Sequence, residues 1–308
     1  MLQITFAPQF PTENLTTMTI RSNRSAFRKI LAGFSFLVLS SVAASILLQT
    51  AVGQDAATPQ PTKADSLPGE PIPTDNAPDD IKQLIEDGKV KVEYDSEGEF
   101  AKSGRGWADF NLREDRKYRF DPITNKRNGR WQVKIIVTKV EEKIVLTHIV
   151  RIPAEVKSPD IWKSWLLRHE FDHVAISLDP RPRMLLTHLL KTLPPIERTL
   201  DLGEEPNNEV LNRLINEQFD KRAKSVHNMI VFNNRTLDNI SHHGTQSVPQ
   251  RADFFRQLYT KENLAEAKFP YLDNVLKLLD SNDYQKAELR YLPSDPADKE
   301  ANADLKEP

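Results

Sequence analysis

Residues 158–180 read SPDIWKSWLLRHEFDHVAISLDP, and they separate a β-rich first half of the chain from a helical second half. Ser158 can cap a helix N-terminus, and Pro159 suits the first helical position. Pro180 cannot donate the backbone hydrogen bond that a helix interior requires. The sequence therefore predicts a helix from Pro159 to about Leu178.

One face of this predicted helix is apolar apart from two histidines. The positions on that face recur at three- and four-residue steps, so they lie one above another and are expected to be buried. They are Trp162, Trp165, Leu166, His169, His173 and Ile176.

The two histidines belong to an H-E-x-x-H motif at 169–173. His169 and His173 are one helical turn apart, so both imidazoles can reach a single zinc ion. Glu170 is rotated by about 100° from His169 and can act as a general base without binding the metal. The alternative is a pair of inert, hydrogen-bonded histidines. Chance produces this motif in roughly one such chain in a hundred, and here it lies on the apolar face of a predicted helix, which favours the metal site.

Strands are predicted before this helix and further helices after it. The segments KVKVEY (89–94) and KYRF (117–120) read as strands, and a loop ending in Asn128-Gly129 marks a hairpin turn. Two β-branched segments, RWQVKIIVTKV (130–140) and KIVLTHIVRIP (143–153), are expected to form a second hairpin about Glu141–Lys143. Helices are expected at 181–192, 206–234, 248–260 and 270–280. Strands followed by helices indicate an α+β fold.

The N-terminal region has the pattern of a secretory signal. Basic residues precede an apolar run from Ile30 to Leu48, and small residues follow at 51–53. Residues 1–53 are therefore predicted to be a signal peptide, with a possible true start at Met18. The alternative is an uncleaved membrane anchor, and membrane association is expected only in that case. Export to the periplasm, the envelope or the extracellular space follows from either.

Three further segments follow the signal. Residues 54–80 are rich in proline and are predicted to be an extended linker. Residues 81–292 are expected to form the folded domain. Residues 293–308 are polar and acidic, as is typical of a disordered tail.

Composition excludes several classes of function. The chain has 308 residues and a net charge of −2, so its overall charge gives no indication of nucleic-acid binding. It has no cysteine, which excludes disulfides, thiolate zinc sites and cysteine nucleophiles.

A catalytic zinc ion usually has a third protein ligand. The compact spacing of one class of zinc proteases would place glycine at 176 and histidine at 179, where this chain has Ile176 and Asp179. Asp179 could bind the ion, although a residue that ends the helix before Pro180 is the better explanation. Glu209 and Glu217 are further candidates on a helical stretch.

A second cluster of polar residues lies at 235–244, which reads RTLDNISHHG. It places Asp238, Ser241, His242 and His243 just before Gly244. Taken alone, this pattern is typical of a polar helix C-terminus with a glycine cap.

The ordered combination of these motifs resembles a bacterial family of predicted secreted zinc-dependent proteases, long labelled as a family of unknown function. The matching pieces are Ile152-Pro153, the tryptophans before H-E-x-x-H, the motif itself, and D-x-x-S-x-H-G at 238–244. Serine at 241 replaces a commoner threonine, and His242 is an additional histidine. The resemblance covers roughly residues 105–260.

The resemblance implies a zincin-like fold and an exported zinc peptidase that acts on a peptide or protein. It implies His243 as the third ligand, with Asp238 as the alternative or as a partner that orients a ligand. Asp172 could likewise orient His169 or His173, or be a surface charge beside Arg168. The strand at 143–152 is expected, by the same resemblance, to pair with an extended substrate.

Two other functions stay open at this point. One is a metal-binding envelope protein without catalytic activity. The other is a zinc hydrolase that acts on a non-peptide amide, such as cell-wall material. The sequence does not indicate an oligomeric state.

Overall fold

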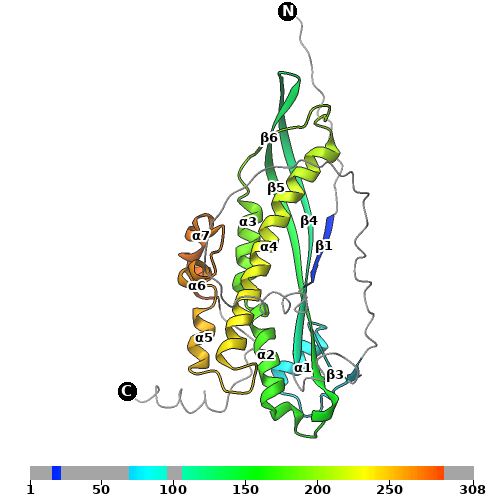
Figure 1. The fold of residues 1–308 in the computed structure, drawn as a ribbon, viewed down its shortest axis with the longest axis vertical. Coiled ribbons are helices and arrows are strands. Elements are labelled where there is room, and N and C mark those ends of the chain that lie inside the picture. The colour runs from blue at the N-terminus through cyan, green and yellow to red at the C-terminus, as the bar shows by residue number, and fades with distance from the viewer. Residues whose placement is uncertain (1–15, 22–68, 96–105, 288–308) are drawn as a thin grey trace, which may run out of the picture. The chain divides into compact units, whose positions relative to one another are not determined.

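A computed structural model describes residues 69–95 and 106–287, and the backbone of residues 16–21. These described residues all belong to one compact unit. Three predicted segments lie outside the described residues. They are the tail, most of the linker, and the signal segment except for residues 16–21. The described chain is a mixed α+β fold, with a sheet followed by helices, which confirms the predicted class (Figure 1).

The sheet is built on one long hairpin. Strand β4 (Trp107–Arg127) pairs antiparallel with β5 (Arg130–Pro153) along its whole length. Asn128 and Gly129 form the turn, with φ of 52° and 76°, as a two-residue hairpin requires. The Asn-Gly turn was therefore predicted correctly.

The other two strand boundaries predicted within this region were wrong. Residues 121–127 continue β4 instead of forming a loop, and Glu141–Lys143 lie inside β5 instead of forming a turn. The physical reason is that Glu141–Lys143 contain no glycine, proline, asparagine or aspartate, so they lack the residues that reverse a chain. These charged residues continue the strand instead, and Glu142 forms an ion pair with Lys191 of a neighbouring helix at 3.3 Å.

Four shorter strands complete the sheet. Strand β1 (Thr16–Arg21) pairs with β4, and β3 (Val90–Asp95) pairs parallel with residues 148–153 of β5. Strand β2 (Glu70–Pro71) pairs with β3, and β6 (Ile196–Thr199) pairs with β5 near the hairpin turn. Because β3 pairs with β5 over 148–153 and β4 pairs with its other edge, half of the strand expected to receive a substrate (143–152) is already paired on both edges.

The region before β3 is part of the folded unit. Ile72 and Ala77 are buried, and α1 (Asp79–Glu86) follows directly. Residues 69–80, which were assigned to the linker by their proline content, therefore pack against the sheet.

The motif helix, α2 (Trp165–Leu178), starts later than predicted. Ser164 is its cap, because its hydroxyl accepts a hydrogen bond from the Leu167 amide. Ser158 makes only a local turn to Asp160. The residues before α2 form two short 3-10 turns, Ala154–Val156 and Ile161–Lys163.

The fold buries more of α2 than the face that was predicted to be buried. Glu170 and Asp172, which lie off that face, are buried, whereas Trp165, which lies on it, is 55% exposed. Every residue from His169 to Ser177 is buried, so α2 is enclosed on all sides over these turns.

The later helices agree with the predicted ones within a few residues, and α4 is six residues longer at its C-terminus. They are α3 (Pro180–Lys191), α4 (Asn208–Ile240), α5 (Arg251–Gln257) and α7 (Leu272–Leu279). Two short helices, α6 (Lys261–Glu266) and α8 (Asn282–Gln285), were not predicted. Helices α3 and α4 run along the sheet (Figure 1), and their apolar faces form a core with Phe110, Leu112 and Ile135 of the hairpin.

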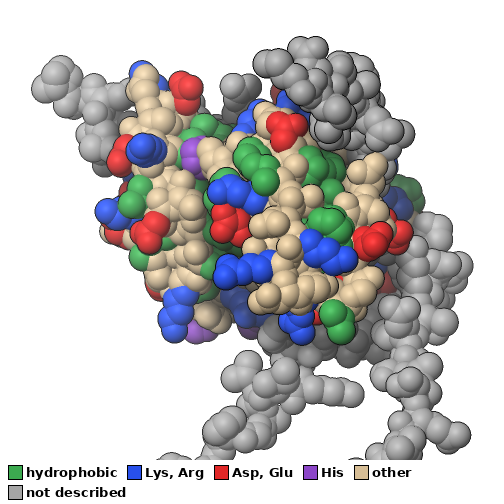
Figure 2. Space-filling view, turned by 90° about the horizontal axis from the view of Figure 1, so that it is seen from above, with side chains coloured by type: hydrophobic (Ala, Val, Ile, Leu, Met, Phe, Trp, Pro, Cys, Tyr) green, Lys and Arg blue, Asp and Glu red, His purple; other side chains and the backbone are tan. Residues whose placement is uncertain are grey.

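The hairpin end of the molecule carries both signs of charge (Figure 2). All residues from 121 to 130 are exposed and include Lys126, Arg127 and Arg130, while the exposed segment after β6 includes Asp201 and Glu205. Among the described residues, no helix is both long and apolar enough to cross a membrane.

Candidate metal centre

Three potential metal ligands converge where α2 meets the C-terminal end of α4. The Nε2 atoms of His169 and His173 are 3.2 Å apart. Oδ1 of Asp238 lies 3.3 Å from the first and 3.1 Å from the second. In the described part of the chain, these residues form a group whose ligand atoms could hold a metal ion.

The spacing of these atoms fits a tetrahedral ion. Zinc binds imidazole nitrogen and carboxylate oxygen at about 2.0–2.2 Å, so two ligands of one tetrahedron are roughly 3.3 Å apart. The three observed separations are close to that value. An ion could therefore sit among the three atoms without moving either helix.

The helices place these side chains through simple periodicity. His169 and His173 are four residues apart on α2, and Asp238 lies in the last turn of α4. Two further side chains, one from α4 and one from its C-cap, contact the same histidines. Asn234 Oδ1 is 3.0 Å from Nδ1 of His173, and Ser241 Oγ is 3.3 Å from Nδ1 of His169.

Glu170 lies beside this group and is as deeply buried as the histidines. The exposed fractions of His169, Glu170 and His173 are 6%, 3% and 3%. The start of β4 packs on Glu170, because a Cβ atom at Gly106 would lie 2.7 Å from Oε1 of Glu170. Burial lowers the pKa of His169, but the hydrogen bond to Asp238 and the charge of Glu170 outweigh burial, so this pKa is raised.

His243 stands next to the group but not within it. Its Nδ1 atom is 3.6 Å from Oδ1 of Asp238, and its side chain is 51% exposed. The structure thus places Asp238, which the sequence offered as the alternative, beside the two motif histidines, and His243 at the edge.

Two other candidate residues have different partners. Asp179 caps α3 by accepting from the Arg181 amide and forms an ion pair with the Arg181 side chain, away from the histidines. Asp172 was expected to orient a histidine or to face solvent. Instead it is buried, and both of its oxygens accept hydrogen bonds from Arg251 of α5.

An unusual turn closes over His169. Three consecutive residues after α4, His242, His243 and Gly244, have positive φ angles of 47°, 58° and 78°. This left-handed path brings Gly244 against the His169 ring, so a Cβ atom at 244 would lie 2.7 Å from the ring carbon Cγ. The glycine is required here both for its φ angle and for this close approach.

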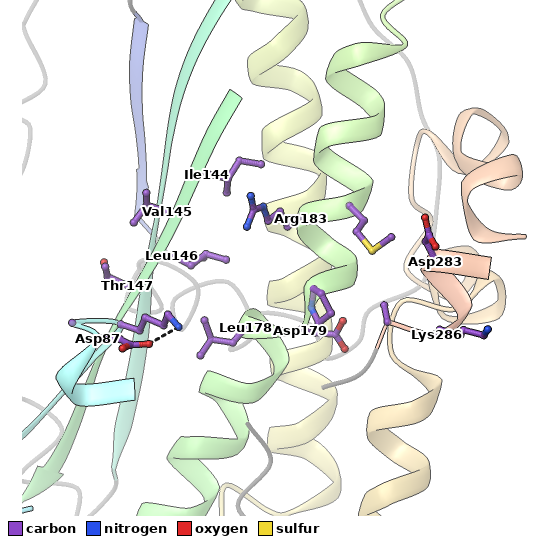
Figure 3. Close-up of a pocket in the computed structure, with 15 residues that line it drawn as sticks. Asp87, Ile144, Val145, Leu146, Thr147, Leu178, Asp179, Arg183, Asp283 and Lys286 are labelled. Carbon is purple, nitrogen blue, oxygen red and sulfur yellow. Dashed lines mark hydrogen bonds and ion pairs between the residues drawn. The ribbon is translucent and has the colours of Figure 1, made fainter. Parts of the chain in front are cut away.

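One sizeable cavity of the described residues does not include the histidines. It has a volume of about 750 Å³ and lies between β5, the junction of α2 and α3, and α8 (Figure 3). Ile144, Leu146, Leu178 and Arg183 line it. The cavity beside His169 is only about 10 Å³, which is close to the space of one water molecule.

Sequence analysis missed two residues of the site, Asn234 and Arg251. Asn234 could have been found from its spacing, because it lies one helical turn before Asp238. Arg251 could not have been found in this way, because it contacts Asp172, which is 79 residues away in the sequence.

Comparisons with known proteins found no match for this chain, whether with protein-family models, curated proteins or solved structures. The resemblance to the secreted protease family therefore stays a prediction.

Proposed function

We propose that this protein is an exported zinc-dependent peptidase with a zincin-like domain, in which His169, His173 and Asp238 hold the metal ion. The observation that carries the proposal is the convergence of two imidazole nitrogens and one carboxylate oxygen within 3.3 Å of one another.

The donor set suits zinc. Two imidazoles and one carboxylate are the protein ligands of one class of catalytic zinc sites, which keep a fourth position open. A bound zinc ion supplies Lewis-acid chemistry there, since it polarises a carbonyl and lowers the pKa of a bound water molecule.

Glu170 is the residue we assign to proton transfer. It is adjacent to His169 in the chain, and its charge acts on that histidine. A carboxylate at this position can accept a proton from the attacking water and pass it to the leaving amine. Peptide hydrolysis requires that transfer, whereas metal binding alone does not.

One observation favours a second candidate, a metal-binding envelope protein without catalytic activity. The histidines and Glu170 are at most 6% exposed, and the neighbouring cavity of about 10 Å³ is too small for a peptide. A structural metal site needs no cleft, whereas a peptidase must open this site to admit a substrate.

The first experiment measures metal in the purified full-length protein. We expect about one zinc ion per chain by elemental mass spectrometry, and its loss in the His169→Ala/His173→Ala double variant. Full zinc occupancy in that double variant would overturn the site.

The second experiment separates peptidase from structural protein. Glu170→Gln keeps the size of the side chain and removes its basicity. For a peptidase we expect zinc-loaded Glu170→Gln to retain the metal and to lose cleavage of a broad peptide library by about 10²–10⁴-fold. Absence of cleavage by the zinc-loaded wild type would instead support the structural candidate.

A further inference from the structure

One face of α4 carries three polar side chains that all contact the candidate metal centre. Asn234, Asp238 and Ser241 are spaced by four and three residues, so they lie along one stripe of the helix and its C-cap. Asp238 reaches the Nε2 atoms of both histidines, while the other two reach one Nδ1 atom each.

The hydrogen bonds of Ser241 determine where the proton of His169 lies. A hydroxyl has one proton and two lone pairs. Ser241 Oγ donates its proton to the Leu237 carbonyl at 2.7 Å and accepts from the Gly244 amide at 3.2 Å. It can therefore only accept from His169, so Nδ1 of His169 carries the ring proton.

Asn234 has the same effect on His173. Its amide oxygen faces Nδ1 of His173 at 3.0 Å, and an oxygen can only accept. The proton of His173 is therefore also on Nδ1. With Nδ1 of each ring engaged in this way, Nε2 is the nitrogen that can present a lone pair to an ion, and in both rings it faces the other histidine and Asp238.

We propose that Asn234 and Ser241 are positioning residues, which hold the protons of His173 and His169 on Nδ1 and thereby set the affinity of the site for zinc. This inference rests on the proposed metal site. It goes beyond that site because neither residue binds the ion itself.

The test compares two substitutions of similar size at one position. Asn234→Leu removes the acceptor, and we expect zinc affinity, measured by competition with a chelator, to fall by about 10–100-fold. Asn234→Asp keeps an acceptor oxygen and adds a negative charge, so its affinity should equal or exceed that of the wild type. A side chain that only fills space would give similar losses in both variants, and that result would overturn the proposal.

Asn233 supplies a matched control. It is fully buried beside Asn234, but its oxygen accepts from Asn263 of α6 at 3.0 Å. Asn233→Leu should lower the stability of the fold and leave zinc affinity within about twofold of the wild type, because its amide does not touch a metal ligand. An equal loss of affinity in Asn233→Leu and Asn234→Leu would assign the effect to the fold and overturn the proposal.

A spectroscopic measurement needs no variant. In the zinc-loaded wild type, long-range proton–nitrogen correlation spectra should show both histidines protonated at Nδ1 and metal-bound at Nε2. Metal bound at Nδ1 of either ring would overturn the proposal. Failure of the wild type to bind zinc would instead reject the metal site on which the proposal rests.

Discussion

Gly244 shows how a single residue can control the candidate centre without belonging to its ligand set. The ring of His169 lies so close to its backbone that a side chain and the ring cannot both keep their places. Its φ of 78° adds a second requirement for glycine. The close contact and the positive φ angle can be separated experimentally, because another glycine of the chain has a positive φ angle without a close contact.

Gly244→Ala is expected to weaken zinc binding roughly 10-fold or more, since the new methyl group pushes His169 out of position. Gly203→Ala is the matched control. Gly203 has a φ of 88°, but a methyl group there would meet no atom within 4 Å. Both variants should lose about 1–2 kcal/mol of stability from backbone strain. Zinc titration should distinguish them, and equal zinc affinities in the two variants would contradict the predicted displacement.

Residue by residue, the sequence predicts the α2 half of the centre better than the α4 half. His169, Glu170 and His173 follow from local helical spacing alone. The choice between Asp238 and His243 depends on how the chain leaves α4. The left-handed path at 242–244 turns the His243 side chain towards solvent, and no periodic pattern in the sequence encodes that path.

At the scale of elements, α5 is tied to the motif helix by one buried ion pair. Arg251, the first residue of α5, and Asp172 of α2 have side chains that are only 6% and 5% exposed. Loss of one partner of such a pair leaves an uncompensated buried charge, whereas loss of both does not.

Asp172→Ala is therefore expected to destabilise the protein by about 3–5 kcal/mol. The double variant Asp172→Leu/Arg251→Met should be much closer to the wild type, because no charge is left buried. Urea denaturation of Asp172→Leu, Arg251→Met and the double variant measures this difference. Additive losses in the double variant would show that the pair is not coupled.

In the long hairpin, the position of the turn could be predicted from the sequence, but the length of the strands could not. Its turn was predictable because Asn128-Gly129 has the residue chemistry of a two-residue turn. Its length was not, because Asp121-Pro122 resembles a loop when the pairing partner is unknown. In the fold, Pro122 pairs with Ile135, and the strand continues past it.

For the molecule as a whole, stability should depend on pH through buried histidines. Burial lowers the pKa of His148 to about 4, against the opposing effect of the Lys89 carbonyl, and burial also lowers that of His227 to about 4. His148 is held neutral, with Nε2 2.6 Å from the Ser177 hydroxyl. In the unfolded chain these groups bind protons near pH 6.5.

Because the unfolded state binds these protons first, stability is expected to fall as pH drops from about 6.5 towards about 4. At pH 5 the loss should be on the order of 2 kcal/mol for His148. Denaturation at pH 7 and pH 5, with a chelator present, measures it. His148→Gln should show a smaller drop than the wild type, and an equal drop would contradict the assignment to His148.

The two ligand-bearing helices are far apart along the chain. His173 and Asp238 are 65 residues apart in sequence. An ion bound to both would close a loop of that length, as a disulfide does, in a chain that has no cysteine. Such a cross-link restricts the unfolded chain and, in the entropy model for disulfides, is equivalent to about 4 kcal/mol. A chelator would remove this cross-link, whereas reducing agents, which break a disulfide, would leave it intact.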